Sequence, residues 1–370
     1  MRVLTVIGAR PQFIKAAPVS AAMREAGCEQ VLVHTGQHYD YGMSQVFFDE
    51  LGIPKPDINL GVGSGKHGQQ TAGMLVGLEE AIETHKPDWV LLYGDTNSTL
   101  AGALASAKLH VPVAHVEAGL RSFNRRMPEE INRIVADSVS DLLFVPTAEA
   151  AANLAHEGVS EEKVHLVGDV MYDAALMHGE RAEQMSDVLQ RIGVCAGDFV
   201  LATVHRAENT DDPDRARVVF EALGRVSDGI PVVLPLHPRT RGVLDALGLL
   251  ADVERRLRII EPVGYLDMIK LERSAAVVAT DSGGVQKEAF FQGVPCVTLR
   301  DETEWVELVE MGWNRVSPPT SVDAVVDAIH SAIGTTGRPV KPYGDGSASR
   351  KIVNVLRAKT AVAQGEAKCH

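Results

Sequence analysis

The stretch VVATDSGGVQKEAFFQGVP, residues 277–295, shows the unit from which the chain is built. A run of small and β-branched apolar residues predicts a buried strand, Asp281-Ser282-Gly283-Gly284 interrupts it, and a helix-like segment follows. Similar strand-like runs alternate with segments of helical length along the rest of the chain, from VLTVIG near the N-terminus to VPCVTLR. Such alternation predicts parallel sheets that are covered by helices on both faces.

The apolar runs are too many for one ordinary open sheet. We therefore predict an α/β fold of two doubly wound, Rossmann-like domains that face each other across a cleft. The length of 370 residues agrees with two domains, at roughly 150 residues per domain. The predicted partition is an N-terminal domain at 1–170, a C-terminal domain at 171–345, and a C-terminal helix at 346–370 that packs back on the N-terminal domain.

Composition excludes several classes of protein. The net charge of -13 argues against a protein that grips nucleic-acid phosphates, because such binding needs many lysines and arginines. The four cysteines lack CxxC spacing, so the sequence indicates neither a disulfide framework nor a metal site. No run of 18 apolar residues occurs, and we expect a cytoplasmic protein without a membrane partner.

The glycine pair of the opening stretch is the first candidate binding feature. A helix N-terminus offers unpaired N–H groups and a partial positive charge, and glycine lets a phosphate approach the backbone. Ser282, Gly283 and Gly284 therefore predict a phosphate cradle, with an ordinary helix cap by Ser282 or Asp281 as the alternative.

Basic residues follow other predicted strands and strengthen the anion hypothesis. Arg10 follows the first strand, Lys15 comes about one turn later, and His205 opens the second domain. Glu288 lies further into the helix after the cradle, where a carboxylate suits two ribose hydroxyls; a solvated helix face is the alternative. The sequence contains neither GxGxxG at the first strand nor a Walker A motif, so it supports neither NAD nor an ATPase, and we predict no cofactor.

Three carboxylates form the second group of candidates. Asp95 follows a strand and could instead cap the next helix. Glu117 follows an apolar strand, where a carboxylate is costly unless it has a partner. Glu129 follows Pro128 at a predicted helix start, with an ion pair to Arg133 as its ordinary alternative. Acids beside an anion site suggest proton transfer next to a phosphorylated leaving group.

The motifs GARPQFIKAAPV, YGDTNSTLA, HVEAGLRS, MPEEINR, TVHRAEN, LHPRT and DSGGVQKEA occur in one order along nearly the whole chain. In this set the chain resembles the bacterial non-hydrolysing UDP-N-acetylglucosamine 2-epimerases, which have a GT-B-like architecture of two Rossmann domains. The resemblance implies elimination of UDP to a 2-acetamidoglucal and re-addition with C2 inverted, by an enzyme that is commonly a homodimer.

The resemblance also implies roles for individual residues. The implied catalytic residues are Asp95, Glu117, Glu129 and His205, and the implied residues for UDP and the sugar are Arg10, Lys15, Arg133, His237, Ser282, Gly283, Gly284 and Glu288.

The resemblance makes UDP-N-acetylglucosamine, converted to UDP-N-acetylmannosamine, the expected substrate, but two features of the sequence leave a second substrate open. Common members carry GTRPE where this chain has GARPQ, and the segments TGQHYDYGMSQVFF and GSGKHGQQTAGM also differ, so an allosteric UDP-sugar site is not implied. The pattern is more similar to the branch that acts on UDP-2,3-diacetamido-2,3-dideoxyglucuronate, and Gln12, His67 and Gln69 are candidates for reading the difference. A GT-B glycosyltransferase and a UDP-sugar sensor without catalysis are the competing hypotheses.

Overall fold

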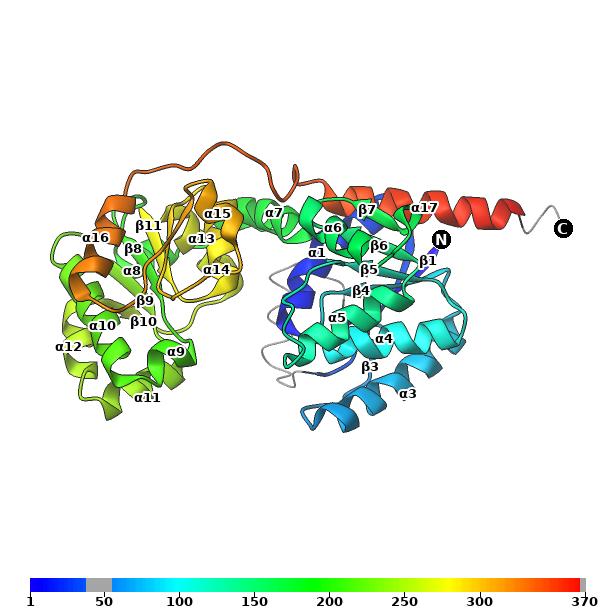
Figure 1. The fold of residues 1–370 in the computed structure, drawn as a ribbon, viewed down its shortest axis with the longest axis horizontal. Coiled ribbons are helices and arrows are strands. Elements are labelled where there is room, and N and C mark those ends of the chain that lie inside the picture. The colour runs from blue at the N-terminus through cyan, green and yellow to red at the C-terminus, as the bar shows by residue number, and fades with distance from the viewer. Residues whose placement is uncertain (38–54, 367–370) are drawn as a thin grey trace. The chain divides into compact units, whose positions relative to one another are not determined.

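The structure, a computed structural model, describes residues 1–37 and 55–366, without the side chains of Arg10 and of 363–366. The chain forms two compact units (Figure 1). Unit 1 consists of Met1–Ala174 together with the segment from Lys341 onward, and unit 2 is Ala175–Val340. Unit 2 is therefore an insertion within unit 1. The division falls inside a helix, α7 (Val170–Met185), whose first residue is the predicted domain boundary.

Unit 1 contains a seven-stranded sheet in the order β3-β2-β1-β4-β5-β6-β7, with every neighbouring pair parallel. Its strands are β1 (Arg2–Ile7), β2 (Glu29–His34), β3 (Ile58–Asn59), β4 (Trp89–Tyr93), β5 (Val113–Val116), β6 (Leu142–Val145) and β7 (Val164–Leu166). Within the described residues, its helices besides α7 are α1 (Arg10–Glu25), α3 (His67–His85), α4 (Asn97–Lys108), α5 (Pro128–Val139), α6 (Ala148–His156) and α17 (Ala348–Glu366), with a 3-10 turn at Glu161–Lys163.

Unit 2 contains a six-stranded parallel sheet in the order β10-β9-β8-β11-β12-β13. Its strands are β8 (Val200–Thr203), β9 (Val232–Pro235), β10 (Arg258–Ile260), β11 (Val277–Thr280), β12 (Cys296–Thr298) and β13 (Asn314–Val316). Its helices are α8 (Val188–Ile192), α9 (Ala207–Thr210), α10 (Pro213–Ser227), α11 (Pro238–Ala246), α12 (Leu250–Arg256), α13 (Tyr265–Ser274), α14 (Gly283–Phe291), α15 (Val306–Glu310) and α16 (Val322–Ala332).

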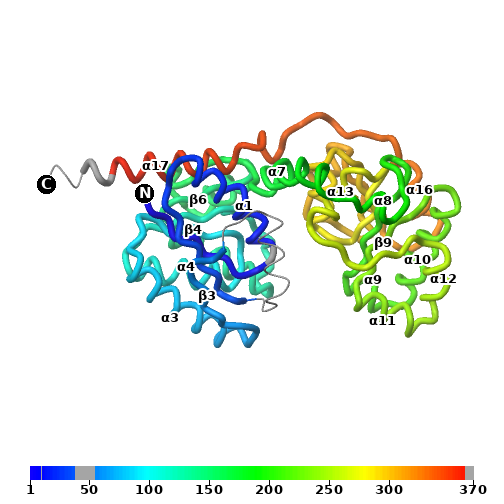
Figure 2. The backbone as a smooth tube through the Cα atoms, turned by 180° about the vertical axis from the view of Figure 1, so that it is seen from behind, coloured from blue at the N-terminus to red at the C-terminus, as the bar shows by residue number. Residues whose placement is uncertain are grey.

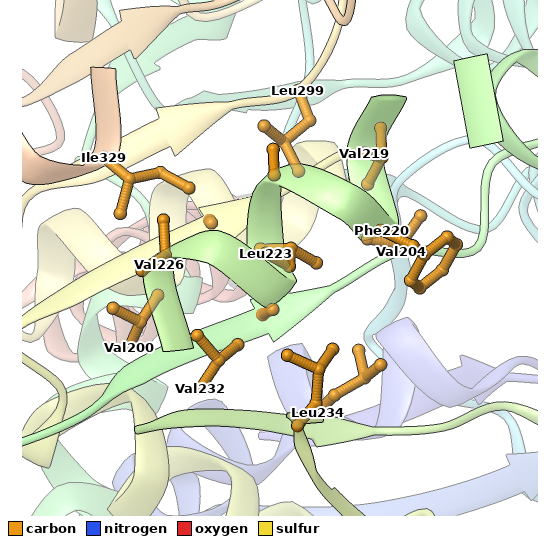
Figure 3. Close-up of a cluster of buried hydrophobic side chains, with 14 of the residues drawn as sticks. Val200, Val204, Val219, Phe220, Leu223, Val226, Val232, Leu234, Leu299 and Ile329 are labelled. Carbon is orange, nitrogen blue, oxygen red and sulfur yellow. The ribbon is translucent and has the colours of Figure 1, made fainter. Parts of the chain in front are cut away.

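Successive strand residues in unit 2 face opposite helical layers. Val200 of β8 packs with α10 and α16, whereas its neighbour Leu201 packs with α8, α13 and α14. Figure 3 shows the first layer, in which Phe220 and Leu223 of α10 lie over the strands. Every position of the central strands β8, β11 and β12 is buried, and these strands are nearly continuous apolar runs, as predicted for a parallel sheet. The edge strand β10 is more exposed.

The C-terminal helix α17 belongs to unit 1, where it packs against α1 (Figure 2). Val90 of β4 points into the core under α3, α4 and α5, so its neighbour Trp89 points to the opposite face. There the buried indole Nε1 of Trp89 donates a hydrogen bond to Thr360 Oγ1 of α17, at 2.9 Å. This bond joins residues that are 271 positions apart in the sequence.

The Trp89–Thr360 bond generates a stability prediction. Thr360→Val leaves a buried indole N–H without its acceptor, and we expect the free energy of unfolding to fall by about 1–3 kcal/mol. Chemical denaturation would measure it. The control is the double variant Trp89→Phe with Thr360→Val, in which no donor is stranded, so the hydroxyl loss should cost less there. Wild-type stability of Thr360→Val would show that the bond does not hold α17.

Candidate active site

The strand order of unit 1 reverses between β1 and β4, and in open parallel sheets ligands bind beyond the carboxyl ends of the strands at such a reversal. The turns at this point are Gly8-Ala9 after β1 and Gly94-Asp95 after β4. The structure therefore brings together segments that are more than eighty residues apart in the sequence.

One buried side chain joins these two turns. Gln12 Oε1 accepts hydrogen bonds from the backbone N–H groups of Gly8 (2.8 Å) and Ala9 (3.1 Å). Its Nε2 donates to the Tyr93 carbonyl at 2.8 Å and approaches the hydroxyls of Thr96 and Thr99 at 3.0 and 3.1 Å. Gln12 is only 1% exposed. Its side chain therefore joins the two turns by hydrogen bonds and does not face a substrate.

Glu117 lies just beyond β5 in a constrained position. Its φ is +72°, which is unusual for a residue with a side chain and indicates that its surroundings hold the backbone there. Its carboxylate forms an ion pair with Lys15 of α1, and both side chains are largely buried. Gly94 leaves room for this pair, because a Cβ there would lie 3.2 Å from Glu117 Oε2 and 3.3 Å from Lys15 Nζ.

The pKa of Lys15 reflects this neighbourhood. Burial alone would lower the pKa, but the Glu117 carboxylate, with smaller contributions from Asp95 and Asp169, raises it above its usual value. Lys15 therefore stays a cation beside Glu117.

Asp95 is held by a cation of its own. Arg133 of α5 forms ion pairs with Asp95 and, at 3.1 Å, with Glu130, while about a third of the Asp95 side chain stays exposed. Asn132 donates to the Asp95 backbone carbonyl at 2.9 Å. Asp95 and Glu117 thus end two neighbouring strands, each beside a basic side chain.

The alternative role for Glu129, an ion pair with Arg133, is wrong, because Arg133 pairs with Glu130 and Asp95. Glu129 is exposed in the first turn of α5. Glu130 is 1% exposed, and it accepts hydrogen bonds from the N–H groups of Ser122 and Phe123, both at 2.9 Å. Burial would raise the pKa of Glu130, but these donors and Arg133 hold it below its usual value. The sequence-based interpretation missed Glu130; its spacing of seven from Asp137, on the same helix face, was the available signal.

The two other candidates for reading the substrate lie at the start of α3. His67 Nδ1 is 3.2 Å from Asn97 Nδ2, and Gln69 is exposed. The buried glutamine is Gln70, which accepts from Asn97 at 2.8 Å and donates to the Gly63 carbonyl at 2.8 Å. His67 also lines a groove of about 550 Å³ with residues of α4 and α5.

Unit 2 reverses its strand order between β8 and β11, and a buried carboxylate joins the two turns at this point. Asp281 is wholly buried and accepts from the N–H groups of His205 (3.1 Å) and Arg206 (3.0 Å), and from Asn209 Nδ2 (3.2 Å). The His205 ring is about half exposed, with Nδ1 at 3.5 Å from Asp281 Oδ1. Asp281 therefore binds the β8–α9 turn.

The N-terminus of α14 has no side-chain cap. Ser282 is the N-cap residue, but its hydroxyl accepts no hydrogen bond from the helix. The alternative interpretation of this motif, an ordinary helix cap by a side chain, is therefore wrong. A Cβ on Gly283 would overlap the carboxylate of Glu304, which Arg300 binds at 2.8 Å. A Cβ on Gly284 would meet only Ser282 Oγ, at 3.9 Å. Gly284 is thus the glycine that leaves open space at the helix start.

Glu288 of α14 has a second glutamate beneath it. Glu272 of α13 is wholly buried, and burial together with the nearby Glu288 raises its pKa well above the usual value. The raised pKa favours the neutral form of Glu272 beside Glu288, which is only partly buried. No sequence signal distinguished Glu272 from other glutamates in helices.

The remaining candidates are His237 and Arg10. His237 is exposed and is the N-cap of α11, where its Nδ1 accepts from the Arg239 N–H at 3.2 Å. Arg10 begins α1, and its side chain lies outside the described residues.

Comparison with known proteins identifies the family. A family model described as UDP-N-acetylglucosamine 2-epimerase matches residues 21–357. The chain belongs to the UDP-N-acetylglucosamine 2-epimerase family. The resemblance found in the sequence motifs is therefore confirmed, and so is the α/β fold class of GT-B-like architecture.

Two curated relatives within this epimerase family carry different substrate names. The chain is 54% identical to the UDP-2,3-diacetamido-2,3-dideoxy-D-glucuronate 2-epimerase of Pseudomonas aeruginosa, over 96% of this chain and 99% of the relative. It is 40% identical to the UDP-N-acetylglucosamine 2-epimerase of Methanocaldococcus jannaschii, over the same shares. A crystal structure of the M. jannaschii enzyme in complex with UDP-GlcNAc and UDP matches with a TM-score of 0.83 and 40% identity, over 97% of this chain and all of that one.

Features of two other classes of function are absent from the described residues. Over 1–37 and 55–366, the structure shows no group of three or more histidine, cysteine or acidic side chains arranged to hold a metal ion. In the same part of the chain, no helix combines the length and the apolar character needed to cross a bilayer.

Proposed function

We propose that this epimerase-family chain inverts C2 of a UDP-linked 2-acetamido sugar by eliminating UDP and adding it back. The observation that carries the proposal is the placement of Asp95 and Glu117 just beyond two adjacent strands, where each carboxylate forms an ion pair with a basic side chain. A sensor that only binds UDP-sugars needs no such pair of carboxylates.

The chemistry explains why more than one acid or base is needed. The C2 proton is not beside a carbonyl, so it becomes acidic only as the C1–O bond to UDP breaks and C1 gains positive character. A base then removes the proton, the C2–H electrons form the C1=C2 bond, and UDP leaves with the C1–O electrons. Protonation of C2 on the opposite face and attack of UDP oxygen on C1 give the epimer. Two faces require proton-transfer groups on both sides, and the cycle needs no oxidant.

The residue roles follow from what each group presents. Glu117 and Asp95 are the proposed proton-transfer groups, with Glu129 and His205 as further candidates, while Lys15 and Arg133 hold the carboxylates in place. Within unit 2, we assign the diphosphate to His205 and the open start of α14 at Ser282, Gly283 and Gly284, and the ribose hydroxyls to Glu288. Arg10 of unit 1 and His237, which follows β9, are further candidates for UDP binding. Stabilising UDP as it leaves is the main catalytic contribution in this scheme.

The substrate is the finer part of the proposal. The 54% identity to the P. aeruginosa enzyme, against 40% for the M. jannaschii enzyme, favours UDP-2,3-diacetamido-2,3-dideoxy-D-glucuronate over UDP-N-acetylglucosamine. A cytoplasmic homodimer remains our prediction.

Proton NMR in D2O tests both the reaction and the substrate. Each UDP-sugar is incubated with the protein and no acceptor. We expect deuterium at C2 together with new anomeric signals of the C2 epimer, because the acid that protonates C2 exchanges its proton with the solvent. Faster exchange with the diacetamido uronate would support the substrate assignment. Absence of exchange with both sugars would contradict the epimerase proposal, and consumption only after an acceptor is added would indicate a glycosyltransferase.

Glu117→Gln tests the proton-transfer role. It keeps the size of the side chain and removes the base, so we expect kcat to fall by about 10²–10⁴-fold while UDP affinity, measured by calorimetry, is unchanged. Glu149→Gln, at an exposed position in α6, is the matched control and should keep wild-type kcat. Full activity of Glu117→Gln would remove this residue from the mechanism.

Gly284→Ala tests the phosphate cradle. Alanine suits a helix and finds open space at this position, so the protein should fold with equal or higher stability. If a phosphate approaches the backbone here, the methyl group should weaken UDP binding by about tenfold, or 1.4 kcal/mol. Gly283→Ala is the comparison, because its methyl group meets the end of the Glu304 side chain within the protein, which must move aside, and not open space. An unaltered dissociation constant for Gly284→Ala would place the phosphates elsewhere.

A further inference from the structure

The end of β5 contains a buried histidine that the mechanism above does not use. His115 is 0% exposed and lies two residues before Glu117. Its Nε2 is 2.7 Å from the Gly94 carbonyl oxygen, and its Nδ1 is 2.7 Å from Asp137 Oδ1. Gly94 directly precedes Asp95, so the ring touches the turn that carries one candidate carboxylate and lies on the strand that carries the other.

The partners of the ring decide where its protons are. A carbonyl oxygen only accepts, so Nε2 must carry a proton. Asp137 Oδ2 accepts from the Gly119 N–H at 3.1 Å and from Arg121 at 2.7 Å, which keeps Asp137 ionised and makes it an acceptor for Nδ1 as well. Both ring nitrogens therefore donate, which is the hydrogen-bonding pattern of an imidazolium.

The surrounding charges agree with this protonation state. Burial alone would lower the pKa of His115, but Asp137, the Gly94 carbonyl and Glu117 raise it above its usual value. Burial would raise the pKa of Asp137, whereas His115 and Arg121 lower it on balance. Arg121 is itself paired with Glu157 at 2.6 Å, so its charge is shared between two acids.

The contact is one of several that hold this turn, beside the hydrogen bonds of Gln12 to the Tyr93 carbonyl and of Asn132 to the Asp95 carbonyl. Gly94 has a φ of +61°, and its N–H donates to the Val116 carbonyl at 3.0 Å, while its own carbonyl is the acceptor of His115. Beyond this turn stand Asp95 and, through the space left by Gly94, the Lys15–Glu117 pair. A neutral ring with a lone pair on Nε2 would face the carbonyl lone pairs and push the turn away.

We propose that His115 is a positioning residue that is protonated at neutral pH, and that its imidazolium N–H holds the Gly94 carbonyl and so sets the positions of Asp95 and Glu117. The inference rests on the proposed epimerase function for its kinetic consequence, but not for the protonation state.

The sign of the pH dependence follows from the raised pKa. The contribution of the imidazolium is complete below the pKa of an unfolded histidine, near 6.5, and is lost as pH rises through the higher pKa in the folded protein. Wild-type kcat should therefore be maintained through neutral pH and decline on the alkaline side as His115 loses its proton.

The first measurement is nitrogen-detected NMR of ¹⁵N-histidine-labelled protein without ligand, with His115→Gln for assignment and exposed His156→Gln as the matched control. We expect both ring nitrogens of His115 to be protonated at pH 7. A single protonated nitrogen would overturn the proposal, and it would do so whether or not the protein turns over either UDP-sugar.

The second measurement compares two amides at position 115. The amide of His115→Gln reaches the place of Nε2 and keeps a donor for Gly94, whereas that of His115→Asn reaches only toward Asp137. We expect His115→Asn to lower kcat on the order of 100-fold, as for a small displacement of reacting groups, and His115→Gln to retain more activity. UDP affinity should stay unchanged in both. Equal loss of kcat in the two variants, or wild-type kcat in His115→Asn, would overturn the positioning role.

Discussion

In both sheets, the candidate site depends on the hydrogen bonds that hold the two turns at the point where the strand order reverses. The two turns at such a point carry backbone N–H and C=O groups that need partners, yet they must leave room for a ligand. Unit 1 meets this requirement with the amide of Gln12, and unit 2 with the carboxylate of Asp281; each is buried and bonds the backbone of the neighbouring turn. Because these side chains form hydrogen bonds to the backbone of the turns, the groups beside them, such as Asp95 and Gly284, remain available for binding and chemistry.

The carboxylates of unit 1 illustrate a second constraint. Burying Glu117 next to Lys15 removes two charges from water, and such pairs contribute specificity of geometry more surely than stability. The same reasoning applies to the charges of His115, Asp137 and Arg121. They lie around the Gly94 carbonyl and the loop at Gly119. Ion pairing therefore orders this end of the sheet, while the apolar strands and helices supply most of the free energy of folding.

The sequence allowed the fold and the main site segments to be predicted because the signals were local. Every apolar run that was assigned to a strand is a strand, and polar residues follow these strands at the expected edge. The strands β3 and β13 were missed because they are short, with two and three residues, and because each contains polar side chains that interrupt an apolar run. The pairing of Arg133 with Asp95, and the hydrogen bonds by which Gln12 joins two turns, depend on which strand lies next to which. Sheet order is a property of the tertiary fold, so local patterns did not contain it.

The insertion of unit 2 within unit 1 has a consequence for the order of events during synthesis. Domains tend to fold as units while the chain leaves the ribosome. All of unit 2 is made before the segment that contains α17, so unit 2 has its complete sequence while unit 1 still lacks its last helix. The indole of Trp89 obtains its acceptor only when Thr360 has emerged, 271 residues later. The N-terminal unit is therefore the last of the two to be finished, although its synthesis begins first.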